Sequence, residues 1–298
     1  MSTPTAPVPT VAERIRAHLR HLPPAERRVA VLLLGGDPLV GLDPVAGLAA
    51  RADTSAPTVL RLLGRLGFDG YAAFQAAVKE EIAARLSSPV QMYPGQSGSG
   101  LMPRMLDSLV ESIRQSQAKL DTDDLRLAVR MLCDSRRRIL LIGGRFSGFL
   151  AEHLAAHLEL LRPDVTVVAP AGGGRAAALL DAGRGSTVVA FDYRRYQDDT
   201  VGFGRTAADQ GAQLLLFTDE YLSPLAGHAT LVLPTSVESD SPFDVLTPAV
   251  ALVETLVAGV IDQLGGPPRD RMARFEELSQ SMLAGSGQHG VIGLGGGR

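Results

Sequence analysis

The hydrophobic pattern changes once along this chain, and that change limits what the chain can fold into. Up to about residue 133, apolar residues recur at helical spacing, as at Val11, Ile15 and Leu19. From residue 139 onward, short continuous apolar runs alternate with helical stretches. Continuous runs are typical of strands buried on both faces, and their alternation with helices predicts a parallel sheet covered on both sides. The sequence therefore predicts an all-α domain followed by an α/β domain with a five-stranded parallel sheet.

The pattern also predicts individual elements. Helices are expected over residues 11–21, 24–34, 56–66, 71–86, 102–120, 123–133 and 243–264. Strands are expected over residues 139–142, 165–168, 187–191, 213–217 and 230–233, with intervening helices that start near residues 147, 174, 199 and 224. Asp43 is expected to cap a short helix with Pro44 at its first position, and Ser55 to cap the next one. Gly67 is expected to end that second helix.

Two segments rich in small and polar residues divide the chain. Residues 87–100 hold many Ser, Gly and Pro residues, as expected of a linker. Residues 285–298 resemble a frayed tail. The predicted domains are therefore residues 1–86 and residues 101–284.

Composition restricts the compartment and the kinds of site. The 298 residues are enough for two domains, and the single cysteine, Cys133, allows neither an internal disulfide nor a zinc site built on cysteines. The first ten residues have neither the basic start nor the apolar core of a signal peptide. The best apolar stretch, residues 245–261, is interrupted by Pro248 and Glu254. These features predict a cytoplasmic protein that does not enter a membrane.

Residues 43–68 indicate a helix, a tight turn and a second helix with small residues where the two would cross. In a helix-turn-helix unit the second helix enters the DNA major groove by its N-terminal half. The first 90 residues hold 10 Arg and Lys against 8 Asp and Glu, a balance that permits DNA binding without requiring it. A plain helical pair whose Ser and Thr only cap is the alternative. The candidate DNA-binding residues are Ser55, Ala56, Pro57, Thr58 and Arg61, which are taken as exposed, and Arg65, which is expected nearer the backbone phosphates.

A family resemblance supports the DNA-binding interpretation of this segment. The segments Leu22-Pro-Pro-Ala-Glu-Arg-Arg, Val45-Ala-Gly-Leu-Ala and Ser55-Ala-Pro-Thr-Val-Leu-Arg, with the ending Leu66-Gly-Phe-Asp-Gly-Tyr71, resemble the N-terminal domain of the MurR/RpiR family of transcriptional regulators. The resemblance extends over roughly residues 11–265. It implies a double-stranded DNA operator as partner.

A glycine-rich turn follows the first expected strand. Gly143, Gly144, Arg145 and Ser147 stand between this strand and a helix, where backbone N–H groups can approach an anion. A tight turn that needs glycine for its own geometry is the alternative. The spacing is not the G-x-G-x-x-G of dinucleotide-binding folds, and no acidic residue ends the second strand, so no nicotinamide cofactor is expected.

The third expected strand ends in a charged segment. Arg194 and Arg195 lie there between two tyrosines, and Thr200 closes the segment. Neighbouring parallel strands end at the same edge of a sheet, so these side chains are expected to face the glycine turn. Glu238, in a later polar loop, is expected to reach the same site. Together with the glycine-turn residues, these are the candidate effector-binding residues.

This half of the chain resembles a sugar isomerase (SIS) domain. The first loop matches at Gly143 to Ser147, and Thr218-Asp-Glu-Tyr-Leu-Ser-Pro-Leu-Ala226 matches the element after the fourth strand. The family's second loop, rich in serine, is not matched, because Asp192 and the two arginines stand there. The resemblance implies a sugar phosphate as ligand, whereas the arginines favour another anion such as a sugar acid. A loop salt-bridged to Asp198 and Asp199, with a vestigial site, is the alternative.

The predicted function is a DNA-binding regulator controlled by a small anion. SIS domains also occur in isomerases, which need a general base, and Glu238, Glu254 and His228 are the candidates here. No acid–base pair is evident, so neither catalytic residues nor a metal or cofactor is expected. A homodimer or homotetramer is expected, because one helix-turn-helix unit recognises only half of a palindromic operator.

Overall fold

The computed structural model describes residues 9–35, 38–86, 90, 101–169 and 172–286. The predicted linker, apart from Val90, and residues 287–298 of the predicted tail lie outside the described residues. The N-terminal helices are α1 (Val11–His18), η1 (Leu19–His21), α2 (Pro24–Leu34), η2 (Pro38–Leu42), α3 (Val45–Arg51), α4 (Ala56–Arg65) and α5 (Tyr71–Leu86). They enclose a core of their own, which includes Ile15, Val29, Leu48, Leu62 and Phe74.

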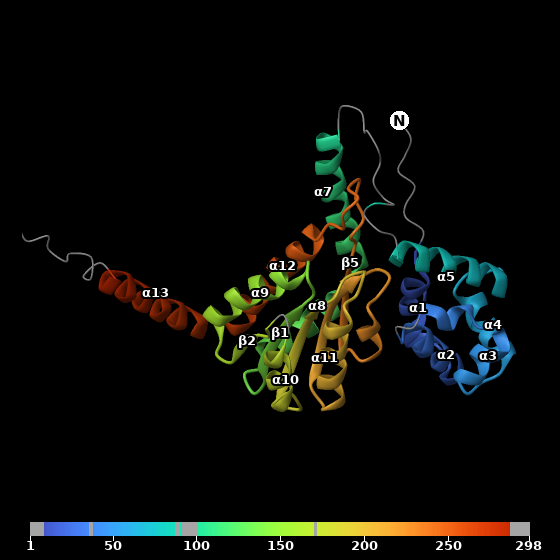
Figure 1. Cartoon of the computed structure of the whole chain (residues 1–298), viewed down its shortest axis with the longest axis horizontal. Helices are drawn as coiled ribbons and strands as arrows, with labels where there is room; N and C mark the ends of the chain where they lie inside the picture. Colours follow the sequence, from blue (N-terminus) through green and yellow to red (C-terminus); the bar gives the residue numbers. More distant parts are fainter. Residues whose placement is uncertain (1–8, 36–37, 87–89, 91–100, 170–171, 287–298) are drawn as a thin grey trace, which may run out of the picture.

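The second half of the chain forms the predicted α/β domain (Figure 1). Its strands are β1 (Arg138–Gly143), β2 (Val165–Val167), β3 (Ser186–Phe191), β4 (Gln213–Asp219) and β5 (Leu231–Thr235). Its helices are α7 (Leu101–Lys119), α8 (Thr122–Cys133), α9 (Gly148–Leu161), α10 (Gly173–Leu180), α11 (Asp198–Asp209), η3 (Pro224–Gly227), α12 (Thr247–Leu264) and α13 (Pro267–Ser286). All strands pair in parallel, in the order β2-β1-β3-β4-β5, which confirms the predicted fold class.

Alternate residues of each strand face opposite helical layers. Leu141 and Val189, which are paired in register, face α8, α9 and α12. Leu140 and Val188, the preceding pair, face α10 and α11. The strand order reverses between β1 and β3, so the carboxyl ends of these two neighbours form the switch point at which open α/β sheets bind ligands.

The C-terminal helices differ from the prediction in three places. A short 3₁₀ turn, η3, replaces the helix expected near residue 224, and α13 was not predicted at all. The helix expected over residues 243–264 begins only at Thr247, and residues 243–246 form a loop before it. α12 has a mean hydropathy of 1.3 over 18 residues and is long and apolar enough, by length and composition only, to cross a membrane. The residues it buries, among them Leu252, Val253 and Leu256, pack in the core of the α/β domain, which explains its apolar character.

The helix-turn-helix unit is formed by α3 and α4. Asp53, with φ of 48°, turns the chain between the two helices, and Gly67, with φ of 80°, ends the second as predicted. The predicted cap at Asp43 is wrong. The N-cap is Pro44, while the Asp43 side chain pairs with Arg51 at 3.2 Å.

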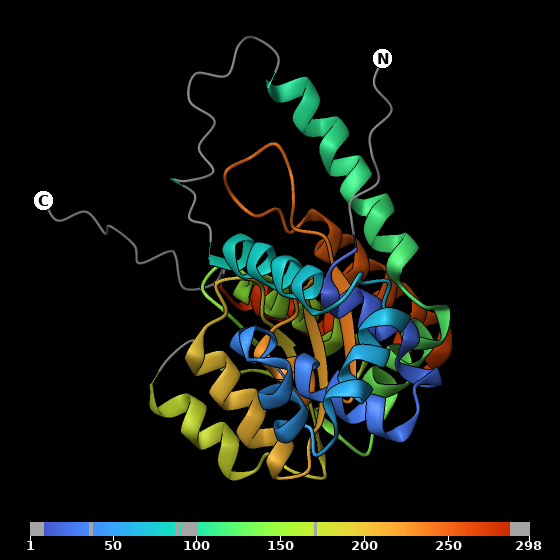
Figure 2. The ribbon, with the colours of Figure 1, turned by 90° about the vertical axis from the view of Figure 1, so that its right-hand side faces the viewer.

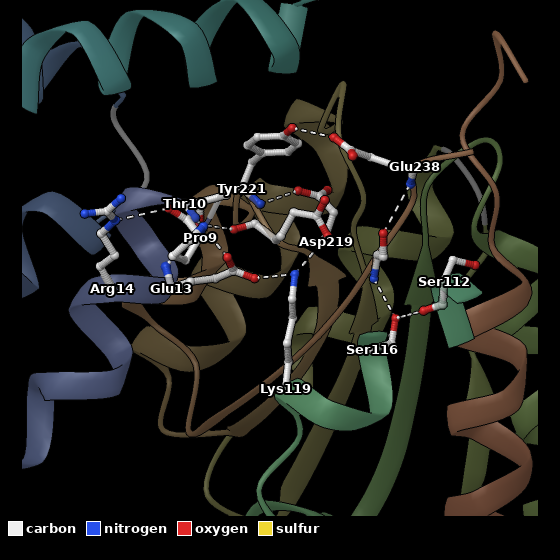
Figure 3. Close-up of polar contacts among 12 residues, drawn as sticks. Pro9, Thr10, Glu13, Arg14, Ser112, Ser116, Lys119, Asp219, Tyr221 and Glu238 are labelled. Carbon is white, nitrogen blue, oxygen red and sulfur yellow. Dashed lines mark hydrogen bonds and ion pairs between the residues drawn. The ribbon is translucent and has the colours of Figure 1, made fainter. Parts of the chain in front are cut away.

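The two domains are in contact. Figures 1 and 2 show α1–α5 on one side of the α/β domain, and Figure 1 shows α13 projecting from the opposite side. Figure 3 shows part of the contact, where Lys119 of α7 pairs with Glu13 of α1 at 2.6 Å. The hydroxyl of Thr10 donates to the carbonyl of Glu220 at 3.1 Å, and Arg16 donates to the carbonyl of Val232 at 2.7 Å.

Candidate functional site

The first turns of α4 present an exposed polar surface. Ser55, Pro57, Arg61 and Arg65 are exposed, and Ala56 is half-buried. Thr58 was expected to be exposed, but only 5% of it is. Its hydroxyl hydrogen-bonds the Ser55 hydroxyl at 3.0 Å and accepts from Arg61 at 2.9 Å. Thr58 therefore orients its two neighbours instead of presenting its own hydroxyl.

A buried carboxylate holds the two arginines of α4. Glu26 of α2 is 4% exposed and lies 2.9 Å from Nε of Arg65 and 4.0 Å from Nε of Arg61. Glu26 was not among the residues predicted from the sequence. Its position at the third residue of α2 looked like ordinary acidic enrichment of a first helical turn.

The glycine turn after β1 is closed by its own polar groups. Ser147 Oγ accepts from the Gly144 N–H at 3.0 Å and donates to the carbonyl of Phe191 at 2.6 Å. The Arg145 N–H donates to the side-chain oxygen of Gln197 at 2.7 Å. A Cβ on Gly143 would lie 2.6 Å from the Cα of Gly148, so this glycine is required for close packing. An anion reaching the Arg145 N–H must displace Gln197.

A pocket of about 700 Å³ opens at the carboxyl ends of β1 and β3. The prediction that the glycine turn and the arginine segment face one another agrees with this geometry, since both line it. The polar lining comprises Gly144, Arg145, Ser147, Asp192, Tyr193, Arg194, Arg195, Gln197, Asp244 and Thr247. The apolar lining comprises Phe146, Phe149, Phe243, Leu246 and Val250. Three arginines against two carboxylic acids suit a small anion with an apolar part.

Asp244 holds the arginine segment. Arg194 donates from Nε to Asp244 at 2.7 Å, and Arg195 lies 3.7 Å from the same carboxylate. The predicted alternative, a loop closed on Asp198 and Asp199, is not observed. Asp199 instead pairs with Arg175 at 3.0 Å. Arg195 has φ of 63°, a conformation that is uncommon for a long side chain and is concentrated at ligand sites.

Asp192 is the most perturbed acid of the pocket. Burial raises the pKa of its carboxyl to about 7, although hydrogen bonds from the Ser223 hydroxyl and the Gln197 N–H oppose this shift. The neighbouring carboxylates of Asp219 and Asp199 raise it further. The carboxyl therefore changes charge near neutral pH, beside the three arginines.

Several predicted residues lie outside the pocket. Gly143 packs beneath it, and Thr200 is fully buried on α11. Glu238 is exposed and accepts from the Tyr221 hydroxyl at 2.9 Å. The other two candidate bases are also elsewhere: Glu254 contacts His153, and His228 lies 4.0 Å from Asp209. Of the described residues that line the pocket, none is a histidine or a glutamate.

Only five of the fifteen described lining residues had been predicted from the sequence: Gly144, Arg145, Ser147, Arg194 and Arg195. Phe243, Asp244 and Leu246 come from the segment before α12, far along the chain from the glycine turn. Phe149 and Val250 lie on α9 and α12 and resembled core residues of apolar helices. Gln197 lies three residues after Arg194, so its position after the third strand could have predicted it in the same way.

The pocket is connected to the helix-turn-helix domain through Arg194. The same guanidinium that holds Asp244 donates from Nη1 to the carbonyl of Ala84 on α5 at 3.3 Å. Nearby, burial raises the pKa of Glu220 to about 8, while Lys119, at 3.9 Å, opposes the shift. The Arg194 contact crosses from the α/β domain to α5, whereas Lys119 and Glu220 both belong to the α/β domain. Lys119 also pairs with Glu13 of α1, which makes it the link between Glu220 and the first five helices (Figure 3).

Comparisons with known proteins agree with both halves of the chain. Residues 10–85 match the helix-turn-helix domain of the rpiR family, and residues 131–259 match the SIS domain. The chain belongs to the RpiR family. This RpiR-family chain is 30% identical over 229 residues to the bifunctional protein glk of Burkholderia mallei, covering 76% of this chain and 35% of that protein. It thus spans about a third of the length of that relative.

Two further proteins are similar over nearly the whole RpiR-family chain. The HTH-type transcriptional regulator HexR of Pseudomonas aeruginosa is 26% identical over 273 residues, covering 89% of this chain and 94% of HexR. The NanR protein of Vibrio vulnificus, solved in complex with ManNAc-6P, is 19% identical with a TM-score of 0.52 and covers 91% of this chain and 98% of NanR. At this identity the likeness to NanR shows a common fold.

Proposed function

We propose that this protein is a transcription regulator whose affinity for an operator changes when a small anion binds the pocket of its SIS domain. The observation that carries the proposal is Arg194, which lines the anion pocket and also hydrogen-bonds α5 of the helix-turn-helix domain. An anion that draws Arg194 away from Asp244 also weakens its bond to Ala84. Binding in the pocket and docking of the DNA-binding domain are therefore coupled.

The proposed ligand is a phosphorylated sugar or a sugar acid. The family supports this class, as does the bound ManNAc-6P of NanR. In the pocket, Arg145 and Arg195 are exposed enough to contact the anionic group, and the phenylalanines flank the sugar. The Ser147 hydroxyl is engaged at both its donor and its acceptor site, so it supports the turn and can bind the anion only by exchanging a partner.

A thermal-shift screen of the full chain tests the ligand class. The panel contains sugar phosphates, sugar acids, amino sugars and small dicarboxylates. At 100 times its dissociation constant, a ligand stabilises the protein by about 2.7 kcal/mol, which is visible as a raised midpoint. Arg195→Gln should abolish the shift, whereas Arg205→Gln, an exposed arginine on α11, should leave it unchanged. If no compound of the panel raised the melting midpoint, a vestigial site would be favoured.

On the DNA side, we propose that α4 enters the major groove and that Ser55, Ala56, Pro57, Arg61 and Arg65 face the duplex, with Thr58 positioning Ser55 and Arg61. Arg61→Ala should then weaken binding to a selected duplex more than binding to random DNA. Equal losses on both would reassign Arg61 to phosphate contact.

We further propose that the protein acts in the cytoplasm and is not an enzyme. The regulators that it resembles support both statements. Its pocket acids, Asp192 and Asp244, are engaged by Ser223 and by arginines, so neither is placed as a free base. An aldose–ketose isomerisation assay on any sugar phosphate that binds tests the second statement, and turnover above the buffer rate would overturn it.

A homodimer is the proposed assembly. Two helices carry exposed apolar stripes: Met102, Leu106 and Val110 on α7, and Met272, Phe275, Leu278 and Met282 on α13. Their spacing places each set on one helix face. A second copy would cover these stripes and bring two DNA-binding domains to a palindromic operator.

A further inference from the structure

Two histidines and a glutamate meet on the surface seam between α9 and α12. His153 and His157 are four residues apart on α9, so they lie on one face of that helix, and Glu254 faces them from α12. One ligand atom from each residue lies within 4.8 Å of the other two. His153 Nε2 is 3.0 Å from Glu254 Oε1, and the two imidazole rings contact edge-on with centroids 4.9 Å apart.

We propose that these three residues form a binding site for a divalent transition metal, with Zn²⁺ as the best match. Two imidazoles and one carboxylate are a ligand set that Zn²⁺ uses, with bonds of about 2.0–2.2 Å and a fourth position left for water. Imidazole ligands favour Zn²⁺ and its neighbours over Mg²⁺ and Ca²⁺, which prefer oxygen. No metal site was expected from the sequence, and these residues form no local motif, since they come from two helices about 100 residues apart.

The surroundings permit such a site. His153 is 35% exposed and the Glu254 side chain 60%, so a metal ion can enter from solvent without opening the core. Glu254 is a charged residue within the most apolar helix of the domain. Its hydrogen bond to His153 does not include His157, the second histidine of the cluster. A metal ion would engage all three side chains.

The site adjoins the anion pocket. Phe149 and Val250 line the pocket, and His153 and Glu254 follow them by four residues, which is one turn farther along the same faces of α9 and α12. A bound metal would therefore fasten together the two helices that form one wall of the pocket. The proposal does not depend on DNA binding or on the identity of the anion.

Calorimetric titration of the full chain, free of any affinity tag, with zinc chloride alone tests the proposal. We expect one zinc ion per chain, with a dissociation constant well below about 100 µM. His153→Ala and His157→Ala should each weaken binding by about tenfold or more, and Glu254→Gln should weaken it similarly. His228→Ala is the matched control, since His228 also lies beside a carboxylate but belongs to no such cluster among the described residues.

Cobalt provides a second readout that does not depend on the variants. Four-coordinate Co²⁺ has stronger visible absorption bands than the hydrated ion, so adding Co²⁺ should produce a band that zinc then removes. The proposal is overturned if zinc produces no binding heat up to about 100 µM. It is also overturned if the folded His153→Ala/His157→Ala double variant, checked by circular dichroism, binds zinc as the unmodified chain does.

Discussion

Asp192 is the pocket acid whose charge changes nearest neutral pH. The residue is 1% exposed, and burial raises the pKa of its carboxyl to about 7. Below that pH it is neutral, and three arginines face the single ionised carboxylate of Asp244. Above that pH it adds a second negative charge, which opposes an anion.

Anion affinity should therefore fall as the pH rises from 6 to 8. A sugar acid is a suitable probe, because its carboxylate stays ionised over this range. Asp192→Asn should bind the acid with little pH dependence. Calorimetric titrations at pH 6, 7 and 8 check this, and an equal decline in the variant would contradict the role given to Asp192.

The raised pKa values of Asp192 and Glu220 predict how the stability of the fold depends on pH. Asp192 and Glu220 have pKa values raised in the folded state to about 7 and about 8, so between about pH 4 and pH 8 the folded chain binds more protons than the unfolded chain. The contribution of these two groups to stability is present at low pH and is lost as the pH rises through this range. The melting temperature of Asp192→Asn/Glu220→Gln should fall less between pH 5 and 8 than that of the unmodified protein. Equal falls would contradict this prediction.

Glu26 offers a test of the DNA-binding surface that leaves the surface residues intact. Glu26→Gln keeps the shape of the side chain but releases Arg61 and Arg65 from a buried negative charge. Affinity for random DNA should rise and the preference for a selected duplex should fall, because the surface gains net positive charge and the arginines lose the carboxylate that orients them. Fluorescence anisotropy with both duplexes checks this, and an unchanged ratio of affinities would contradict it.

At the scale of elements, α4 depends on its buried face. Leu62 is fully buried and Leu60, two residues earlier on the same helix, is 45% exposed. Leu62→Ala should lower the free energy of opening α4 by about 2–5 kcal/mol, whereas Leu60→Ala should change it by less than about 0.5 kcal/mol. Hydrogen exchange of the α4 amides measures this free energy in both variants. Similar losses in Leu62→Ala and Leu60→Ala would show that the buried core does not stabilise α4.

Local patterns predicted the elements whose signals are local. α2 and α5 begin and end at the predicted residues, because Pro24 starts the first of them and the Asp69–Gly70 turn precedes the second. The cap at Asp43 failed because Arg51, eight residues later, pairs with that side chain. α13 was missed because its apolar residues are mostly exposed and are interspersed with charged ones, which gives a weak helical pattern. The far wall of the pocket was missed because Phe243 and Asp244 were expected in the first turn of a helix over residues 243–264, whereas they lie in the loop before α12. Only the fold brings this loop to the glycine turn.

At the scale of the whole molecule, the exposed stripes predict a dimer. Phe275→Asp/Met282→Asp should dissociate it, because two charges would be placed in an apolar contact. Gln280→Asp, a charge at another exposed position of α13, should have little effect. Sedimentation equilibrium distinguishes the outcomes, and a monomeric unmodified chain would contradict the proposed assembly.

The central claim is that an anion in the pocket changes the affinity of the chain for DNA. The most direct measurement is the affinity of the full chain for a duplex that it selects from a random pool, with and without a sugar phosphate or sugar acid that raises its melting temperature. A coupling of about 1–3 kcal/mol would change that affinity by about 5–150-fold, and Arg195→Gln should abolish the change. An anion that binds the pocket while leaving the DNA affinity unaltered would contradict the claim.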